Sequence, residues 1–217
     1  RILELSRAYK ISLDTGWDVP PGVLHAPASL CTYEPQFASD VYAMYQSVLY
    51  YDHCVPESLL WKNCPDEEIG NYDYLVDVID WEKNVDPDFH RNRFMRPLVC
   101  RSGEGFVEEW ICYKCPIVGA KRLTVAPGAT VTVSDGFAYG MILVQGKGTM
   151  NGIKIETPAL IRFDELTNDE FFVSEKAATA GVTITNVSDT EPVVILKHFA
   201  ENKELTEIVS RIADSDC

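Results

Sequence analysis

Hydrophobic and polar residues alternate through most of the chain between residues 106 and 199. A period of two is typical of antiparallel strands that bury one face. Asn151-Gly152, between two such segments, predicts a two-residue hairpin, because both residues tolerate a positive φ. Many short strands separated by turns predict an all-β sandwich or jelly-roll barrel. The expected strands are 106–113, 121–125, 130–133, 140–144, 148–150, 153–155, 159–163, 170–173, 182–186 and 193–198.

The end of the chain changes to a helical period. Segment 202–213 places Leu205, Ile208, Val209 and Ile212 three or four residues apart, which is the spacing of one apolar helix face. We expect this helix to dock on the barrel.

An acidic stretch precedes the strands. Nine Asp or Glu residues and one Lys lie between Asp66 and Asp88, so eight of the fourteen excess negative charges fall in this short segment. Asn71 can cap a short helix whose apolar face would comprise Leu75, Val76 and Ile79. We interpret the stretch as a solvated connector.

Composition excludes several classes of function. The chain has 217 residues, 46% of them hydrophobic, and a net charge of −14, which does not suit nucleic-acid binding. No apolar run approaches the roughly 20 residues of a membrane span. The sequence begins with Arg1 rather than Met, so we expect further residues upstream.

Seven cysteines at irregular spacing favour reduced thiols and a cytoplasmic location over a disulfide framework. Cys112 and Cys115 have the spacing of half a zinc ribbon or of a redox pair. Residues three apart on a strand face opposite ways, and no second pair follows. Packing as small hydrophobic side chains is the alternative.

Two motifs resemble those of the cupin superfamily. Segment 141–152, Met-Ile-Leu-Val-Gln-Gly-Lys-Gly-Thr-Met-Asn-Gly, is similar to the strand, Gly-x-Gly, strand and Asn-Gly core of a cupin barrel. Segment 20–25, Pro-Pro-Gly-Val-Leu-His, resembles the second cupin motif, whose His is a metal ligand. The resemblance implies an all-β fold with a cupin (jelly-roll) barrel, a partial second cupin barrel and a few short helices.

A narrower resemblance is to the type I phosphomannose isomerases. His25-Ala26, Glu34 nine residues after His25, and Ala-Ser-Asp-Val at 38–41 match a pattern that in those enzymes precedes a connector helix and a second barrel. The implied domains are 1–55, the C-terminal half of a first cupin barrel; 56–99, the acidic connector; 100–200, a second barrel; and 201–217, the C-terminal helix.

The same resemblance implies a site and an activity. His25 would be a metal ligand, Glu34 and Asp40 catalytic residues, and Ser39 a substrate contact. The cofactor would be a divalent metal, zinc in the first place, with iron, manganese or cobalt as alternatives. The expected reaction is a mannose-6-phosphate isomerase-like aldose–ketose isomerisation of a sugar or sugar phosphate, in which a carboxylate moves the proton through an enediolate.

Some features depart from the isomerase pattern. Val-Tyr-Ala-Met-Tyr at 41–45 lacks the Arg that follows in those enzymes. The second barrel has Phe-Ala-Tyr-Gly at 137–140 where a metal-binding cupin has His-x-His, so we expect that barrel to be metal-free. The alternative function is a non-catalytic cupin that binds a carbohydrate or a partner subunit, and a cupin oxygenase is a third. The remaining metal ligands would lie upstream, in the other half of the first barrel, or in a second subunit.

Overall fold

The computed structural model describes the chain except residues 1, 28, 39–42, 50–51 and 216–217. The chain divides into two compact units. The first comprises 1–13, 19–32 and 36–92, and the second comprises 14–18, 33–35 and 93–217. Each unit is described separately below.

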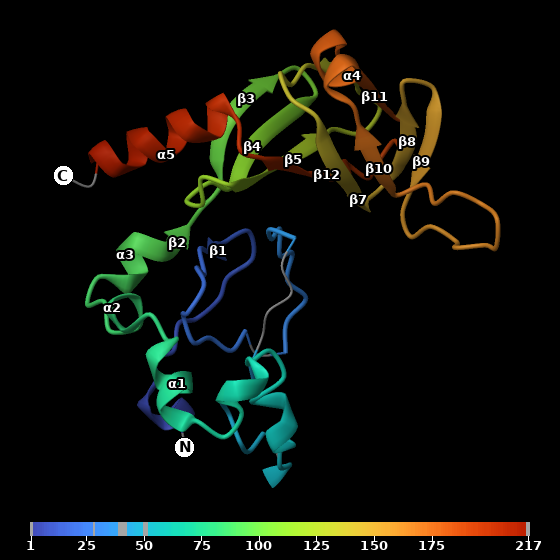
Figure 1. Ribbon diagram of the computed structural model, residues 1–217. Helices are drawn as coiled ribbons and strands as arrows, with labels where there is room; N and C mark the ends of the chain where they lie inside the picture. The colour runs from blue at the N-terminus through green and yellow to red at the C-terminus, as the bar shows by residue number, and fades with distance from the viewer. Residues whose placement is uncertain (1, 28, 39–42, 50–51, 216–217) are drawn as a thin grey trace. The chain divides into compact units, whose positions relative to one another are not determined.

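The second unit is a sandwich of two antiparallel sheets, with strand orders β10-β7-β12-β5-β4-β3 and β6-β11-β8-β9 (Figure 1). From β5 onward the chain passes repeatedly from one sheet to the other, which is the jelly-roll arrangement. The predicted all-β jelly roll is therefore confirmed. The strands are β3 Leu98–Gly103, β4 Phe106–Cys112, β5 Val118–Val125, β6 Thr130–Val133, β7 Tyr139–Gln145, β8 Lys147–Met150, β9 Ile153–Glu156, β10 Glu170–Val173, β11 Val182–Asn186 and β12 Val193–Ala200.

The alternation of hydrophobic and polar residues in the sequence corresponds to an alternation of buried and partly exposed side chains in the strands. In β12, Val193, Ile195, Lys197 and Phe199 are buried, and Val194, Leu196 and His198 between them are only partly covered. The hairpin predicted at Asn151-Gly152 is also confirmed, since both residues have positive φ and join β8 to β9. The inward positions of the two sheets thus form one continuous hydrophobic core.

One predicted strand is wrong. Residues 159–163 form part of an exposed loop between β9 and β10 and pair with no strand. Conversely, β3 was not predicted, because its burial does not alternate and it carries Cys100, Arg101 and Ser102. It pairs with β4 at the edge of the larger sheet.

Helices complete the second unit. The C-terminal helix α5, Lys203–Ser215, confirms the predicted one, with Leu205 and Ile208 buried and Val209 packed against the core. The short helix α4, Glu175–Ala180, is capped by the side chain of Ser174. A small two-stranded sheet pairs β1, Gly16–Trp17, with β2, Phe94–Met95.

The first unit consists mainly of loops and helical turns. Asn71 caps α1 as predicted, accepting a hydrogen bond from the Tyr74 amide at 3.3 Å. Leu75 and Ile79 are buried, but Val76, expected on the same face, is exposed. The helical elements are η1 Ile2–Leu5, η3 Glu57–Leu59, η4 Asp66–Glu68, α1 Tyr72–Asp77, α2 Trp81–Asn84 and α3 Phe89–Arg93.

The described residues of the first unit contain one isolated β-bridge, Val48 with Cys54, and no named strand. The partial barrel and its boundary at residue 55 therefore stay predictions. No helix within the described residues is long and apolar enough to cross a membrane.

Candidate functional site

The predicted metal ligand His25 follows a turn that is fixed to the connector. Gly22 has φ +77°, and a Cβ there would lie 2.9 Å from the Asp80 nitrogen. The positive φ and the close approach of Asp80 both require glycine at this position. The Gly22 carbonyl accepts hydrogen bonds from the Asp80 amide at 3.1 Å and from Asn84 Nδ2 at 2.7 Å. Asn84 Oδ1 accepts from the Leu24 amide at 2.9 Å. Asn84 therefore holds the turn on both sides of the buried Val23.

The ring of His25 is anchored through one nitrogen. Nδ1 lies 3.0 Å from the carbonyl oxygen of Val23, and only a protonated Nδ1 can donate to that oxygen. In the neutral imidazole this leaves the lone pair on Nε2. Metal-binding histidines characteristically have their second nitrogen fixed in this way. His25 therefore suits the role of one metal ligand.

A complete ligand set is not present around His25 in the described part of the chain. No three His, Cys, Asp or Glu side chains come close enough to hold a metal ion among the described residues. Ser39 and Asp40, predicted for substrate contact and catalysis, lie outside the described residues. One imidazole does not make a metal site, so the structure supplies no metal geometry from which to derive a reaction step.

The local structure around His25 and Glu34 differs from the expected one. In the half barrel that the resemblance implies, the two side chains could face one interior if they lay on neighbouring strands. Both segments are instead irregular, and both side chains are exposed. His25 lies in the first unit and Glu34 in a short segment of the second. Their functional roles stay predictions.

Tyr33, beside Glu34, contacts the sandwich. Its hydroxyl lies 3.2 Å from Nδ1 of His198 on β12. Burial raises the pKa of Tyr33 above its ordinary range, and burial lowers the pKa of His198. Both side chains therefore stay uncharged near neutral pH, and the 33–35 segment is held to the sheet by a neutral hydrogen bond.

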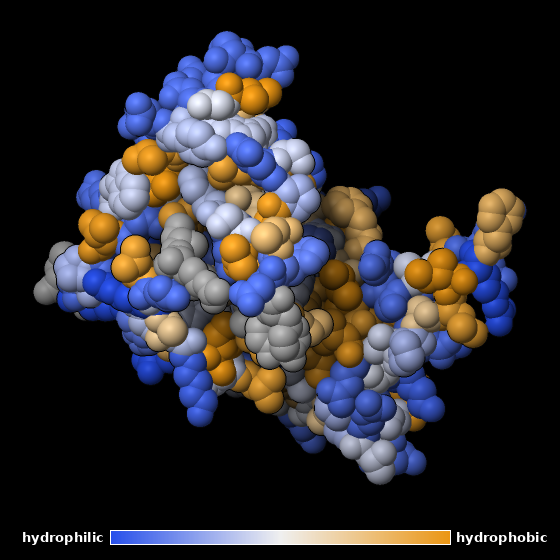
Figure 2. Space-filling view, turned by 90° about the horizontal axis from the view of Figure 1, so that it is seen from below, coloured by the Kyte–Doolittle hydropathy of each residue, from blue (hydrophilic) through white to orange (hydrophobic). Residues whose placement is uncertain are grey.

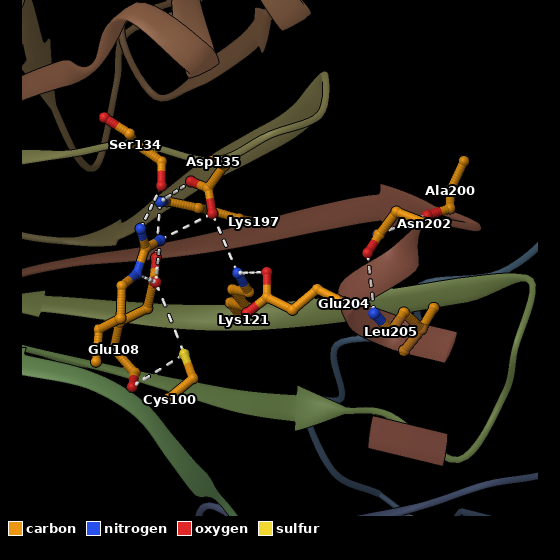
Figure 3. A network of polar contacts seen from close by, with 11 residues as sticks. Cys100, Glu108, Lys121, Ser134, Asp135, Lys197, Ala200, Asn202, Glu204 and Leu205 are labelled. Carbon is orange, nitrogen blue, oxygen red and sulfur yellow. Dashed lines mark hydrogen bonds and ion pairs between the residues drawn. The ribbon is translucent and has the colours of Figure 1, made fainter. Parts of the chain in front are cut away.

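The interior of the sandwich contains a network of charged side chains that the sequence analysis missed (Figure 3). Lys197 Nζ lies 2.7 Å from both Glu108 Oε1 and Asp135 Oδ2. Lys121 Nζ lies 3.1 Å from Asp135 Oδ1 and 2.7 Å from Glu204 Oε2 on α5. These two lysines, Glu108 and Asp135 are all buried.

Arg101 completes the network from the edge strand β3. Its guanidinium group contacts both Glu108 and Asp135, the latter at 2.8 Å. Three cations thus meet three carboxylates, counting Glu204, and the charges balance. We name these six residues the interior charge network: Arg101, Glu108, Lys121, Asp135, Lys197 and Glu204.

At Asp135, pairing with cations outweighs the effect of burial on the pKa. Burial would raise the pKa of Asp135, but Lys197, Lys121 and Arg101 together lower it to about 2. The lysines also lie over aromatic rings, Lys121 Nζ at 4.6 Å from the centroid of Trp110 and Lys197 Nζ at 5.0 Å from that of Tyr139. Ring faces attract cations and so help to replace the lost water.

The interior charge network does not suit a divalent metal. Each buried carboxylate, Glu108 and Asp135, already meets at least two cationic side chains. A metal there would add two positive charges beside two lysines and an arginine.

Cys112, at the end of β4, is partly buried against the core. Burial raises the pKa of its thiol to about 12, which suits a packing role.

The network could have been recognised from the strand periodicity. Glu108, Lys121 and Lys197 each occupy an inward position, two residues from a core residue such as Trp110, Leu123 or Ile195. Charged residues at inward positions must be paired, so they predict mutual contact.

Comparison with known proteins gives fold neighbours only. No family model and no curated protein matches the sequence. Among solved structures, a mutant of Bacillus subtilis oxalate decarboxylase is similar, with 19% identity over 51% of this chain and 30% of that chain and a TM-score of 0.35. An RmlC-like cupin from Shewanella frigidimarina shows 18% identity over 50% and 86% of the two chains, TM-score 0.32.

KdgF from a Halomonas species shows 12% identity over 49% of this chain and 89% of that chain, with a TM-score of 0.32. The matched part of this chain spans about a third of the oxalate decarboxylase chain. These neighbours are cupin-fold proteins, and their activities are their own. The assignment of the fold to this chain rests on the strand order described above.

Proposed function

We propose that the chain is part of a metal-dependent aldose–ketose isomerase that acts on a sugar or sugar phosphate. The observation that carries this proposal is the anchored ring of His25, whose Nδ1 is bound to the Val23 carbonyl at 3.0 Å. A ring fixed in this way presents Nε2 as a ready ligand at little cost in side-chain entropy. The motif around it, with Glu34 nine residues later, adds the resemblance to phosphomannose isomerases.

The metal and the nearby side chains would each have a different role in the isomerisation. A divalent metal, zinc in the first place, would polarise the sugar oxygens and so acidify the neighbouring C–H. Glu34 would take the proton from one carbon and return it to the next, which the exposed carboxylate can do once substrate binding excludes water. Asp40 and Ser39 would orient the sugar hydroxyls. Asn84 would act as a positioning residue, because it fixes the turn that carries His25.

An activity assay tests the proposal. The full-length protein should interconvert mannose 6-phosphate and fructose 6-phosphate, or the unphosphorylated pair, and a chelator should abolish the activity until zinc is restored. Glu34→Gln should reduce kcat by at least about 100-fold, since removing a general base costs this much. Glu104→Gln, a change in an exposed turn of the second unit, is the matched control. Activity unaffected by Glu34→Gln contradicts the role of Glu34.

A non-catalytic cupin is the second candidate. The interior of the sandwich is filled by paired charges and a packed core, which favours a structural role for this barrel. In that case the full-length protein would bind a sugar without converting it. Equilibrium binding of mannose in the absence of turnover, by wild type and Glu34→Gln alike, would favour this candidate over the isomerase.

A further inference from the structure

The loop between β9 and β10 carries four large apolar side chains that are almost entirely exposed. Leu160 is 74% exposed, Ile161 89%, and Phe163 and Leu166 94% each. Figure 1 draws this loop extending away from the two sheets, and Figure 2 shows hydrophobic side chains gathered on the corresponding projection. Exposed apolar groups concentrated in this way mark an interaction site.

Backbone hydrogen bonds close the loop at its neck and at its tip. Its neck is closed by hydrogen bonds from the Glu156 amide to the Asn168 carbonyl at 3.0 Å and from the Leu143 amide to the Asp169 carbonyl at 2.7 Å. Its tip is a turn in which the Glu165 amide donates to the Arg162 carbonyl at 3.2 Å. The apolar side chains are thus carried by a loop that is hydrogen-bonded at its neck and at its tip.

Two further exposed apolar side chains lie on the strands that flank the loop. The loop joins β9 and β10, and each of these strands is the edge of its sheet. Ile153 on β9 is 55% exposed and Phe172 on β10 is 76% exposed. Covering a side chain of this size removes on the order of 100 Å² of apolar surface. Six such side chains supply roughly 600 Å², most of the ~800 Å² that each partner contributes to a standard interface.

The charges at the tip fit a second copy of this chain. Arg162 and Glu165 form an exposed pair at 3.7 Å, and Asp164 lies between them. A twofold contact needs a surface that is complementary to itself, and a tip with both signs of charge meets that need. Acidic residues at the tip do not suit an anionic lipid surface, which attracts Lys and Arg. We propose that two copies of this chain associate through the 157–169 loop and the adjoining edges of β9 and β10.

Analytical ultracentrifugation tests this interface directly. Between about 1 and about 100 μM, a range that covers a micromolar dissociation constant, the average mass of the wild-type chain should rise from near its 24.3 kDa monomer mass toward twice that value. Phe163→Glu should raise the dissociation constant at least about thirty-fold, the effect of losing a central apolar anchor. Val99→Glu is the matched control, because Val99 is 62% exposed on β3, at the opposite edge of the larger sheet.

A charge exchange provides a second readout. Arg162→Glu should weaken the dimer, and adding Glu165→Arg to it should restore the association, because the tip then carries both signs again. Near-UV circular dichroism should be unchanged in the loop variants, since the loop lies outside the sheets. A monomeric wild type at about 100 μM, a Phe163→Glu variant that still dimerises, or loop-dependent binding of phosphatidylcholine vesicles by a monomeric chain would overturn the proposal.

Discussion

The hydroxyl of Tyr33 lies 3.2 Å from Nδ1 of His198, and the ring of this histidine covers Gly140 on the paired strand β7. A Cβ at Gly140 would lie 2.0 Å from Nε2 of the same ring. The missing side chain at Gly140 therefore creates the space in which His198 meets Tyr33. This contact holds the segment that carries Glu34 against the sandwich.

Gly140→Ala should lower the free energy of unfolding by about 1–3 kcal/mol, the usual cost of forcing an extra methyl group into a packed site. The new methyl group displaces His198 and breaks its contact with Tyr33. Urea unfolding followed by fluorescence measures the loss. The double variant Gly140→Ala, His198→Ala should be less destabilised than the sum of the single variants, because the clash is gone. Additive losses would show that the ring is not the obstacle.

Lys197→Met should cost about 3–5 kcal/mol, because it leaves Glu108 and Asp135 buried with fewer compensating cations. Thermal or urea unfolding gives the value. The control is Lys154→Met, whose side chain is 65% exposed and paired with Glu156. Its stability should be unchanged within error. Equal stability of the two variants would mean that the interior charge network is not buried as described.

Acid should weaken the sandwich through Asp135. Its pKa is lowered from its ordinary value of 3.8 to about 2 in the folded chain. A lowered folded-state pKa stabilises the fold above the unfolded-state pKa, and the contribution is lost as pH falls from about 4 to about 2. It amounts to roughly 2 kcal/mol. Urea unfolding at a series of pH values should show this slope in wild type and a flatter profile in Asp135→Asn. Parallel profiles would assign the acid sensitivity to other carboxylates.

Asn84→Ala should free the turn before His25 without unfolding the sandwich. The Leu24 amide loses its acceptor and the Gly22 carbonyl loses one donor. Amide hydrogen exchange at Leu24 should speed up at least about tenfold, as expected for the net loss of one to two hydrogen bonds. Asn92→Ala, which removes an exposed contact to Asp86, is the control. Unchanged exchange at Leu24 would show that the turn is held by other contacts.

Much of the sandwich was predictable, because its inward positions are apolar with a period of two. The Asn151-Gly152 hairpin and the Asn71 cap were predictable for local reasons, positive φ in one and a side-chain acceptor in the other. The segment 159–163 has the same apolar content as a strand. Its side chains have no sheet partner, however, and propensity alone does not supply one.

The candidate site was predictable only in part. The motif that ends at His25 was recognised in the sequence, but the turn that it forms was not. The attachment of this turn to Asn84 joins residues 60 positions apart and leaves no local pattern. The interior charge network likewise depends on which strands face each other. Its members are visible as charges at inward positions, whereas their pairing requires the strand order.

Metal content of the full-length protein tests the central claim most directly. After dialysis against zinc and then against buffer, inductively coupled plasma mass spectrometry should find about one metal ion per chain in wild type and in the control His53→Ala. In His25→Ala the metal should be lost or bound at least about tenfold more weakly. Equal metal content in wild type and His25→Ala, or no metal in either, would contradict the assignment of His25 as a ligand.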